Sequence, residues 1–227
     1  MYKLSTTFKS ATLAIAASTA LLFAATAVAG SDNGKSKGKP GKNMILEGGT
    51  IAEIAAAVND GGNGEFNNLL TVVGCFGPVT LVPGDNLIID LLNGSDKYTL
   101  FAPTDAAFAN LLGRLEPLFP GVSANPCILD DNEDLSMNTL FTVLTYHVTE
   151  GRRFSNSVFN SNNAKMIPTL AEIDITSYVT ADEVPVLQDV DNQEVFVVAP
   201  LFNINAVNGV IHVVDAVLLP IDLPGDA

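Results

Sequence analysis

One apolar segment near the C-terminus constrains the fold of this chain more than any other part of its sequence. Apolar side chains run almost unbroken from Val210 to Leu219, β-branched residues dominate, and Asn208-Gly209 supplies a turn signal in front of them. A strand with one wet face would alternate apolar and polar residues, so a continuous run indicates burial on both faces. We therefore expect residues 210–219 to form a strand covered on both sides.

The remaining periodicity places helices early in the chain and strands late. Helices are expected over residues 50–58, 65–73, 86–92, 104–112 and 135–146. Strands are expected over residues 98–102, 174–180, 184–188 and 194–199, with a hairpin turn at Asp191-Asn192 and an irregular, acidic stretch over residues 115–134. This segregation argues for the α+β class rather than for repeated βαβ units.

Residues 1–29 have the organisation of a secretory signal peptide. Lys3 and Lys9 give a basic start, residues 11–28 are mostly apolar, and Ala27-Val28-Ala29 is a small-x-small cleavage site. A transmembrane anchor is the alternative, but the segment is short, rich in small residues and followed by no charged stop. The style of the signal suggests bacterial export, so we expect a secreted or periplasmic product with no integral membrane segment after cleavage.

Two regions follow the cleavage site: a linker over residues 30–42 and a single domain over residues 43–227. The linker combines Gly, Ser and Pro with four lysines, and it has too little apolar surface to order itself. We interpret it as a solubilising spacer, with a basic arm for an anionic surface as the alternative.

Charge is divided unevenly between these regions. The chain has 11 basic and 25 acidic residues and a net charge of −14, yet six of the basic residues and one acidic residue precede residue 43. The domain is therefore more acidic than the whole chain. Nucleic-acid binding is disfavoured because phosphate contacts require clustered Lys and Arg, and an anionic membrane would repel such a domain.

The two cysteines, Cys75 and Cys127, form a third constraint. In an oxidising, extracytoplasmic compartment an even cysteine count indicates a disulfide, which here would close a large loop. A metal site is the alternative, but two thiols without nearby histidines fall short of the four ligands of a structural zinc site.

Three motifs resemble, in the right order, the signatures of the fasciclin domain family. Residues 98–108 resemble its N-terminal signature, residues 144–148 its central Tyr-His motif, and residues 208–220 its C-terminal signature. The resemblance extends over about residues 50–220. The signature positions in this sequence are Tyr98, Phe101, Ala102, Pro103, Thr104, Asp105, Phe108, Tyr146, His147, Asn208, Gly209, His212 and Asp215.

The resemblance implies a fold and a structural role for these residues. A fasciclin-like fold is a β-wedge of two sheets flanked by several helices, and residues 76–85 and 113–134 look like insertions into it. Because each insertion contains or borders a cysteine, we hypothesise that the disulfide joins these two loops. Thr104, Asp105 and Asn208 are expected to hold the turns in place, while Pro103 and Gly209 fix their backbone.

Patterns that would indicate catalysis or metal binding are scarce. The sequence has no Gly-x-Ser-x-Gly elbow, no Gly-rich phosphate loop and no His-Glu-x-x-His motif. We expect His147 and His212 to be core residues, with a direct binding contact as the alternative for His147. The acidic runs Asp130–Asp134 and Asp189–Glu194 are interpreted as solvated turns and caps, with weak calcium binding at Asp130–Asp134 as the alternative. We expect no cofactor.

The resemblance also implies a function: a secreted, non-enzymatic module of adhesion and recognition in cell-surface, matrix or biofilm attachment. Its partner would be a cell-surface or matrix protein or glycan. In animal matrix members an Asp-Ile pair before the C-terminal signature is linked to integrin binding, but here that position is Asn203-Ile204, which argues against integrins. The alternatives are a periplasmic small-ligand carrier or sensor and a hydrolase with a non-standard site.

Overall fold

The computed structural model describes residues 48–58, 65–77, 84, 86–129, 137–160 and 163–221. The predicted signal peptide, the linker and the acidic run Asp130–Asp134 lie outside these ranges and stay predictions. Within the described ranges, no helix combines the length and the apolar character that a membrane span requires.

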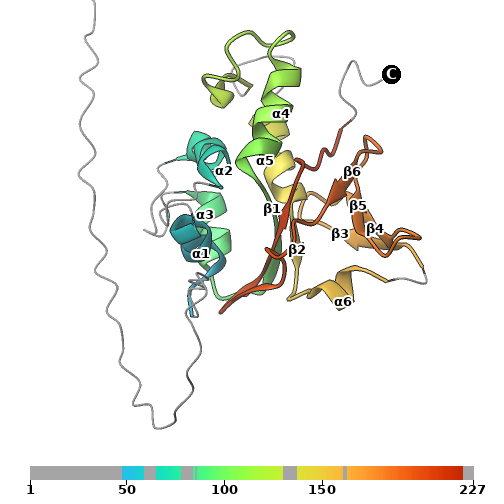
Figure 1. The fold of residues 1–227 in the computed structure, drawn as a ribbon. Helices are drawn as coiled ribbons and strands as arrows, with labels where there is room; N and C mark the ends of the chain where they lie inside the picture. The colour runs from blue at the N-terminus through green and yellow to red at the C-terminus, as the bar shows by residue number, and fades with distance from the viewer. Residues whose placement is uncertain are drawn as a thin grey trace, which may run out of the picture. The chain divides into compact units, whose positions relative to one another are not determined.

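Two four-stranded sheets form the centre of the domain (Figure 1). The first has the order β2–β1–β8–β7, formed by Val148–Glu150, Tyr98–Pro103, Gly209–Val214 and Ile204–Ala206. β1 and β8 lie in its middle and pair in parallel, whereas its outer pairs are antiparallel. The second has the order β3–β4–β5–β6, formed by Lys165–Pro168, Asp174–Val179, Pro185–Gln188 and Glu194–Phe196, and is antiparallel throughout.

Helices pack on the face of the first sheet that points away from the second sheet (Figure 1). They are α1 (Ile51–Val58), α2 (Asn67–Val73), α3 (Leu87–Asn93), α4 (Asp105–Leu115) and α5 (Met137–Tyr146). A short α6 (Ser155–Val158) and the 3-10 turns η2 (Gly74–Phe76) and η3 (Pro126–Leu129) complete the described helical segments. This arrangement of two sheets flanked by helices confirms the predicted α+β class.

β8 is buried on both sides because the first sheet separates two hydrophobic cores. Ile211 and Val213 join the core beneath the helices, together with Leu100 of β1. Val214 and Phe101 belong instead to the core shared with the second sheet. All six residues of β8 are buried, as the unbroken apolar run predicted.

The predicted strand over residues 210–219 is nevertheless too long, because β8 ends at Val214. Residues 217–219 remain buried, but the amides of Leu218 and Leu219 donate to side chains instead of to a neighbouring strand. Residues 215–221 are called the C-terminal strap below. An apolar run predicts burial and does not by itself predict a strand ladder, which is why the sequence overestimated the strand.

Two other boundaries differ from the sequence prediction. β6 ends at Phe196, and Val197 and Val198 cross to the first sheet, where they pair with Val214 and Val213 of β8. α4 continues to Leu115 because its last turns pack in a third, smaller core around Val122. The predicted irregular stretch over residues 115–134 was therefore wrong at Leu115, which belongs to α4. The prediction also did not include η3.

The short strands β2, β3 and β7 were missed, since three or four residues give too little periodicity to detect. The turn at Asp191-Asn192 is confirmed between β5 and β6, where Asn192 has a positive φ of 58°.

A disulfide joins Cys75 to Cys127, with 5.4 Å between the two Cα atoms. Cys75 lies in η2, directly after α2, and Cys127 lies in η3 within the loop that follows α4. The predicted pairing is confirmed. A sequence separation of 52 residues corresponds to about 4 kcal/mol of stabilisation in the chain-entropy description of the unfolded state.

Candidate functional site

Asn208 forms a buried joint between β8 and the ends of two helices. Its side chain is 1% exposed, and its Oδ1 accepts a 2.8 Å hydrogen bond from the Ile51 amide at the start of α1. Its Nδ2 donates to the carbonyls of Leu92 and Gly94 at the end of α3, at 2.8 and 3.0 Å. Helix ends carry backbone groups without intrahelical partners, so one amide side chain satisfies such groups on α1 and α3 together.

Gly209 allows β8 to approach β1 at this joint. A Cβ on Gly209 would lie 2.0 Å from the Tyr98 carbonyl oxygen and 2.5 Å from Cδ1 of Ile51. Both distances are far below van der Waals contact, so the position requires the absence of a side chain.

Thr104 and Asp105 cap two different helices. Thr104 Oγ1 accepts from the Ala107 amide at 3.1 Å and so caps α4. The Asp105 carboxylate reaches across to α2: Oδ1 accepts from the Asn68 amide at 2.7 Å and Oδ2 from the Asn67 side chain at 2.8 Å. Because the N-cap of α2 is Phe66, which has no side-chain acceptor, Asp105 supplies this cap from a distant part of the chain.

His147 connects α5 to the C-terminal strap. It is 3% exposed, its Nδ1 lies 2.7 Å from the Val143 carbonyl, and its Nε2 accepts from the Leu218 amide at 2.9 Å. This pattern requires a neutral ring with the proton on Nδ1. Burial, opposed in part by the bond to Val143, lowers the pKa of His147 from its ordinary value of 6.5 to about 4.

His212 occupies the middle of β8 and faces the second core. Its ring stacks on Phe101 with 5.8 Å between centroids, its Nε2 lies 2.9 Å from the Arg153 carbonyl, and its Nδ1 accepts from the Asn203 amide at 3.4 Å. Burial is the main cause that lowers the pKa of His212. Both ring nitrogens of each histidine are therefore engaged by the backbone, as expected for core residues.

Two aspartates fix the C-terminal strap. Asp215 Oδ1 accepts from the Phe196 amide at 2.8 Å, which links the end of β8 to β6 of the other sheet. Asp189 is 6% exposed; its two carboxylate oxygens accept from the amides of Gln193 and Leu219, each at 2.9 Å. Asp189 is thus an anchor of the turn and of the strap. The run 189–194 forms a turn as interpreted, but the Asp189 carboxylate is buried and not solvated, because the strap covers it.

The apolar signature residues fill the two cores. Ala102 and Phe108 pack beneath the helices, with Tyr98 at the edge of that core, while Phe101 and Tyr146 lie between the sheets. The Tyr146 hydroxyl donates to the Asp174 carbonyl at 3.1 Å, and burial raises the pKa of that phenol. Pro103 ends β1 opposite Val214 of β8.

Asn203, the first residue of the Asn203-Ile204 pair, holds the segment before β7 against α6. It has a positive φ of 56°, its Oδ1 accepts from the Ser155 amide at 2.7 Å, and its Nδ2 donates to the Ser155 hydroxyl at 2.8 Å. Both the oxygen and the nitrogen of the Asn203 side-chain amide are therefore hydrogen-bonded within the domain.

Two buried polar anchors, Asn86 and Thr99, were not predicted from the sequence. Asn86, 1% exposed, caps α3 through the Ile88 and Ile89 amides at 3.1 and 3.2 Å, and an Asn before an apolar helical run was the available signal. Thr99 Oγ1 donates to the Gly151 carbonyl at 2.8 Å, and no sequence pattern marked it.

A small hollow is lined by described residues. It lies between α4 and the C-terminal strap, bordered by Leu111, Arg114, Gln193 and Val217, and has a volume of about 40 Å³. Ligand pockets usually measure about 300–1,000 Å³. Among the described residues, no three His, Cys, Asp or Glu side chains converge as metal ligands would.

Comparison with known proteins assigns the fold that holds these residues. The sequence model of the family described as Fasciclin domain matches residues 79–220. The chain belongs to the fasciclin domain family. The chain is also 30% identical to the protein sll1483 of the cyanobacterium Synechocystis sp. over 171 residues. These residues cover 75% of this chain and 73% of that protein.

A solved structure described as a FAS1 domain pair from the insect cell adhesion molecule fasciclin I is also similar to this fasciclin domain. The TM-score is 0.48 and the identity 17%, over 75% of this chain. The chain spans 51% of that solved chain, which is about half of its length.

Proposed function

We propose that this fasciclin-domain protein is exported and acts without catalysis as an adhesion and recognition module that attaches to a cell surface, a matrix or a biofilm. One observation supports this most: the polar signature residues are bonded within the domain. The side chains of Asn208, Asp105, His147 and His212 each bond to backbone groups of other elements, and Thr104 caps its own helix α4. They act as a framework that holds the surface in shape.

The bonding of the two histidines also supports action without catalysis. A general base requires an accessible nitrogen lone pair within reach of a reacting proton. In His147 and His212 that lone pair accepts from the amides of Leu218 and Asn203. The hydrolase alternative would have to break one of these bonds.

The test is attachment of the purified, exported chain to whole cells and to matrix preparations, measured at two salt concentrations. The matched variant replaces the four linker lysines, Lys35, Lys37, Lys39 and Lys42, by serine. We expect saturable binding in both proteins, because recognition belongs to the domain. Binding that disappears with the lysines would assign attachment to the linker. Failure of both proteins to bind any surface would reject the adhesion proposal.

A further inference from the structure

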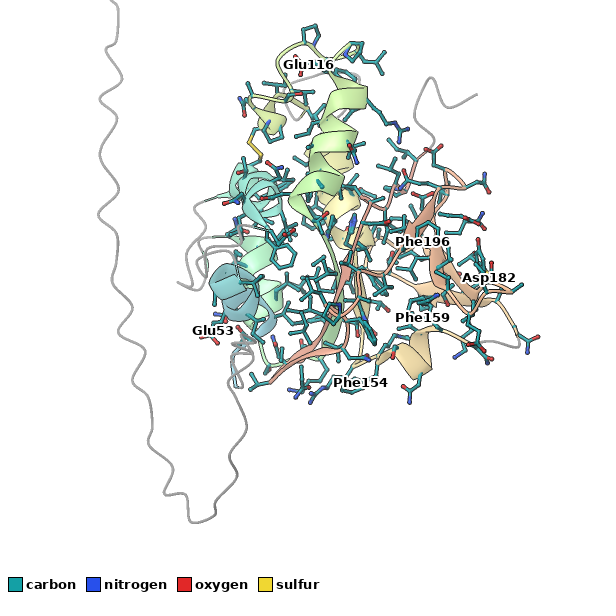
Figure 2. The ribbon with its side chains drawn as sticks, in the orientation of Figure 1. Glu53, Glu116, Phe154, Phe159, Asp182 and Phe196 are labelled. Atoms are coloured by element: carbon teal, nitrogen blue, oxygen red, sulfur yellow. A yellow bond between two sulfur atoms is a disulfide. The ribbon has the colours of Figure 1, made fainter. Side chains whose placement is uncertain are left out.

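The basic residues of this acidic domain are gathered in one place. After residue 42 the chain has five Lys and Arg residues: Lys97, Arg114, Arg152, Arg153 and Lys165. Arg152 and Arg153 lie within the segment 151–158, which contains α6, and Lys97 and Lys165 lie next to this segment. We call Lys97, Arg152, Arg153, Phe154 and Lys165 the basic surface; Phe154 marks it at the lower edge of Figure 2.

Hydrogen bonds along the segment 151–158 hold the basic surface together. At one end the Gly151 amide donates to the Lys97 carbonyl at 2.6 Å, and at the other Lys165 Nζ donates to the Ser157 carbonyl at 2.8 Å. Between them Arg152 donates to the Asn205 side chain of β7. Four cations from three distant parts of the sequence therefore share one stretch of surface.

The charges of this surface are not neutralised within the described part of the chain. The ion pair found there is Arg114–Asp191, at 3.8 Å, and it lies elsewhere. The cations of the basic surface bond instead to neutral acceptors: Lys97 Nζ to the Val207 carbonyl at 3.0 Å and Arg153 Nε to the Glu150 carbonyl at 3.0 Å. In a domain with so many carboxylates, pairing four cations with uncharged groups leaves them available to an external anion.

Exposed aromatic and apolar side chains accompany these cations. The Arg152 guanidinium lies 5.9 Å from the centre of the Phe154 ring, and Phe154 is 38% exposed. Phe202 and Val207, which flank β7, are 41% and 49% exposed. Arg and aromatic residues are the side chains most enriched at interfaces, so this combination has the composition of a binding surface.

We propose that the basic surface binds an acidic polysaccharide, with the arginines pairing to sugar carboxylates and the exposed phenyl rings packing against the apolar faces of the sugars. A guanidinium fork matches a carboxylate in two parallel hydrogen bonds. This inference rests on the proposed adhesive function and names the chemistry of its partner.

A slender chain fits this surface better than a membrane does. Asp96 and Glu150 border the cations, and the rest of the domain is strongly acidic. At physiological salt, charges act over about 8 Å, so a single polymer strand experiences mainly the local cations. A flat anionic bilayer would also face the surrounding carboxylates and be repelled.

The experiment measures the affinity of the exported chain for polygalacturonate, a linear polymer of uronic acids, by calorimetry. Fully methyl-esterified polygalacturonate has the same backbone without charge and is the control ligand. We expect the acidic polymer to bind at least tenfold more tightly than the ester. Equal binding of the two would overturn charge recognition, and tighter binding to single-stranded DNA or to phosphatidylserine vesicles would overturn the choice of partner.

Two charge reversals locate the contact. Arg152→Glu and Arg114→Glu change the net charge equally, but Arg114 belongs to α4, at the opposite end of Figure 1 from α6. We expect Arg152→Glu to lower the affinity about tenfold and Arg114→Glu to lower it less than twofold. Phe154→Ala, which leaves the charge unchanged, should also weaken binding severalfold. All variants keep the linker lysines, so the linker contributes equally.

The same variants separate this inference from the proposed function. If Arg152→Glu attaches to cells and matrix as well as the unaltered chain does, the basic surface is not the contact, although the adhesive function stands. If Arg152→Glu and Arg114→Glu weaken polymer binding equally, the effect is general electrostatics and the site is rejected. If the unaltered chain binds no surface, the adhesive function itself fails.

Discussion

Gly209 shows how a single missing side chain sets the distance between two strands. Replacement by alanine would place a Cβ 2.0 Å from the Tyr98 carbonyl oxygen, and a backbone atom cannot rotate away as a side chain can. We expect Gly209→Ala to lower the free energy of unfolding by about 3 kcal/mol or more, as overpacking of rigid interiors does. Urea denaturation followed by circular dichroism measures the change.

Gly113 provides the matched control. It lies exposed in α4, and a Cβ there would meet no atom within 4 Å. Alanine is the better helix former, so Gly113→Ala should raise the free energy of unfolding by about 1 kcal/mol. Equal effects of the two substitutions would show that the contact between β8 and β1 is looser than described.

His147 makes stability depend on pH. In the unfolded chain its imidazole takes up a proton near pH 6.5, whereas in the folded protein it does so only near pH 4. The unfolded state therefore binds the extra proton first, and stability falls as the pH drops from about 6.5 to about 4. A shift of this size corresponds to about 3 kcal/mol, to which His212 adds in the same direction.

Two measurements check the pH dependence of stability. Denaturation midpoints between pH 7 and pH 4 should fall steadily, and NMR signals of the His147 ring should stay those of a neutral imidazole above about pH 5. Burial raises the pKa of Asp189, which offsets part of the loss at the acidic end. A His147 signal that titrates near 6.5 would show that the bond to the Leu218 amide is absent.

α2 illustrates an element whose start is defined by a different part of the chain. Its own N-cap position offers no side-chain acceptor, and Asp105 of α4 supplies one. We expect Asp105→Ala to cost about 1–2 kcal/mol, the range for loss of a helix cap. Amide hydrogen exchange should accelerate first at Asn68 and its neighbours, while Thr104 still caps α4.

Asp182 is the control for this substitution. It lies exposed in the turn between β4 and β5, at the right edge of Figure 2, so Asp182→Ala removes the same carboxylate without removing a cap. The stability of Asp182→Ala should match that of the unaltered chain. Unchanged exchange at α2 in Asp105→Ala would mean that water caps the helix equally well.

Repulsion among carboxylates affects the stability of the whole molecule. The chain carries a net charge of −14, and the described residues contain one ion pair, Arg114–Asp191. Added salt screens repulsion between exposed charges. We therefore expect the melting temperature to rise by several degrees between 10 mM and 300 mM sodium chloride, as measured by calorimetry.

Sucrose, raised to the same osmolarity, controls for solute effects other than screening. Potassium and sodium chloride should act alike, because screening depends on ionic strength rather than on the ion. A melting temperature that falls with salt would indicate that attractive pairs outweigh the repulsion.

The sequence by itself determined what depends on local patterns and composition. The β8 segment was recognisable as buried on both sides. The helix that begins near residue 104, the Asp191-Asn192 turn and the α+β class followed from local patterns, and the cysteine pair followed from its number and predicted compartment. These features follow from side-chain chemistry within a few residues or from counts, so no knowledge of the packing was needed.

Only the tertiary structure decided which distant groups meet. That the apolar run leaves the sheet at Val214, that Asp105 caps α2, and that His147 accepts from the Leu218 amide all depend on contacts between segments remote in sequence. The basic surface is of the same kind, because hydrogen bonds join Lys97 and Lys165, which lie elsewhere in the sequence, to the segment that contains Arg152. Hydrophobic periodicity reports which faces are buried, but it does not specify the partner that buries them.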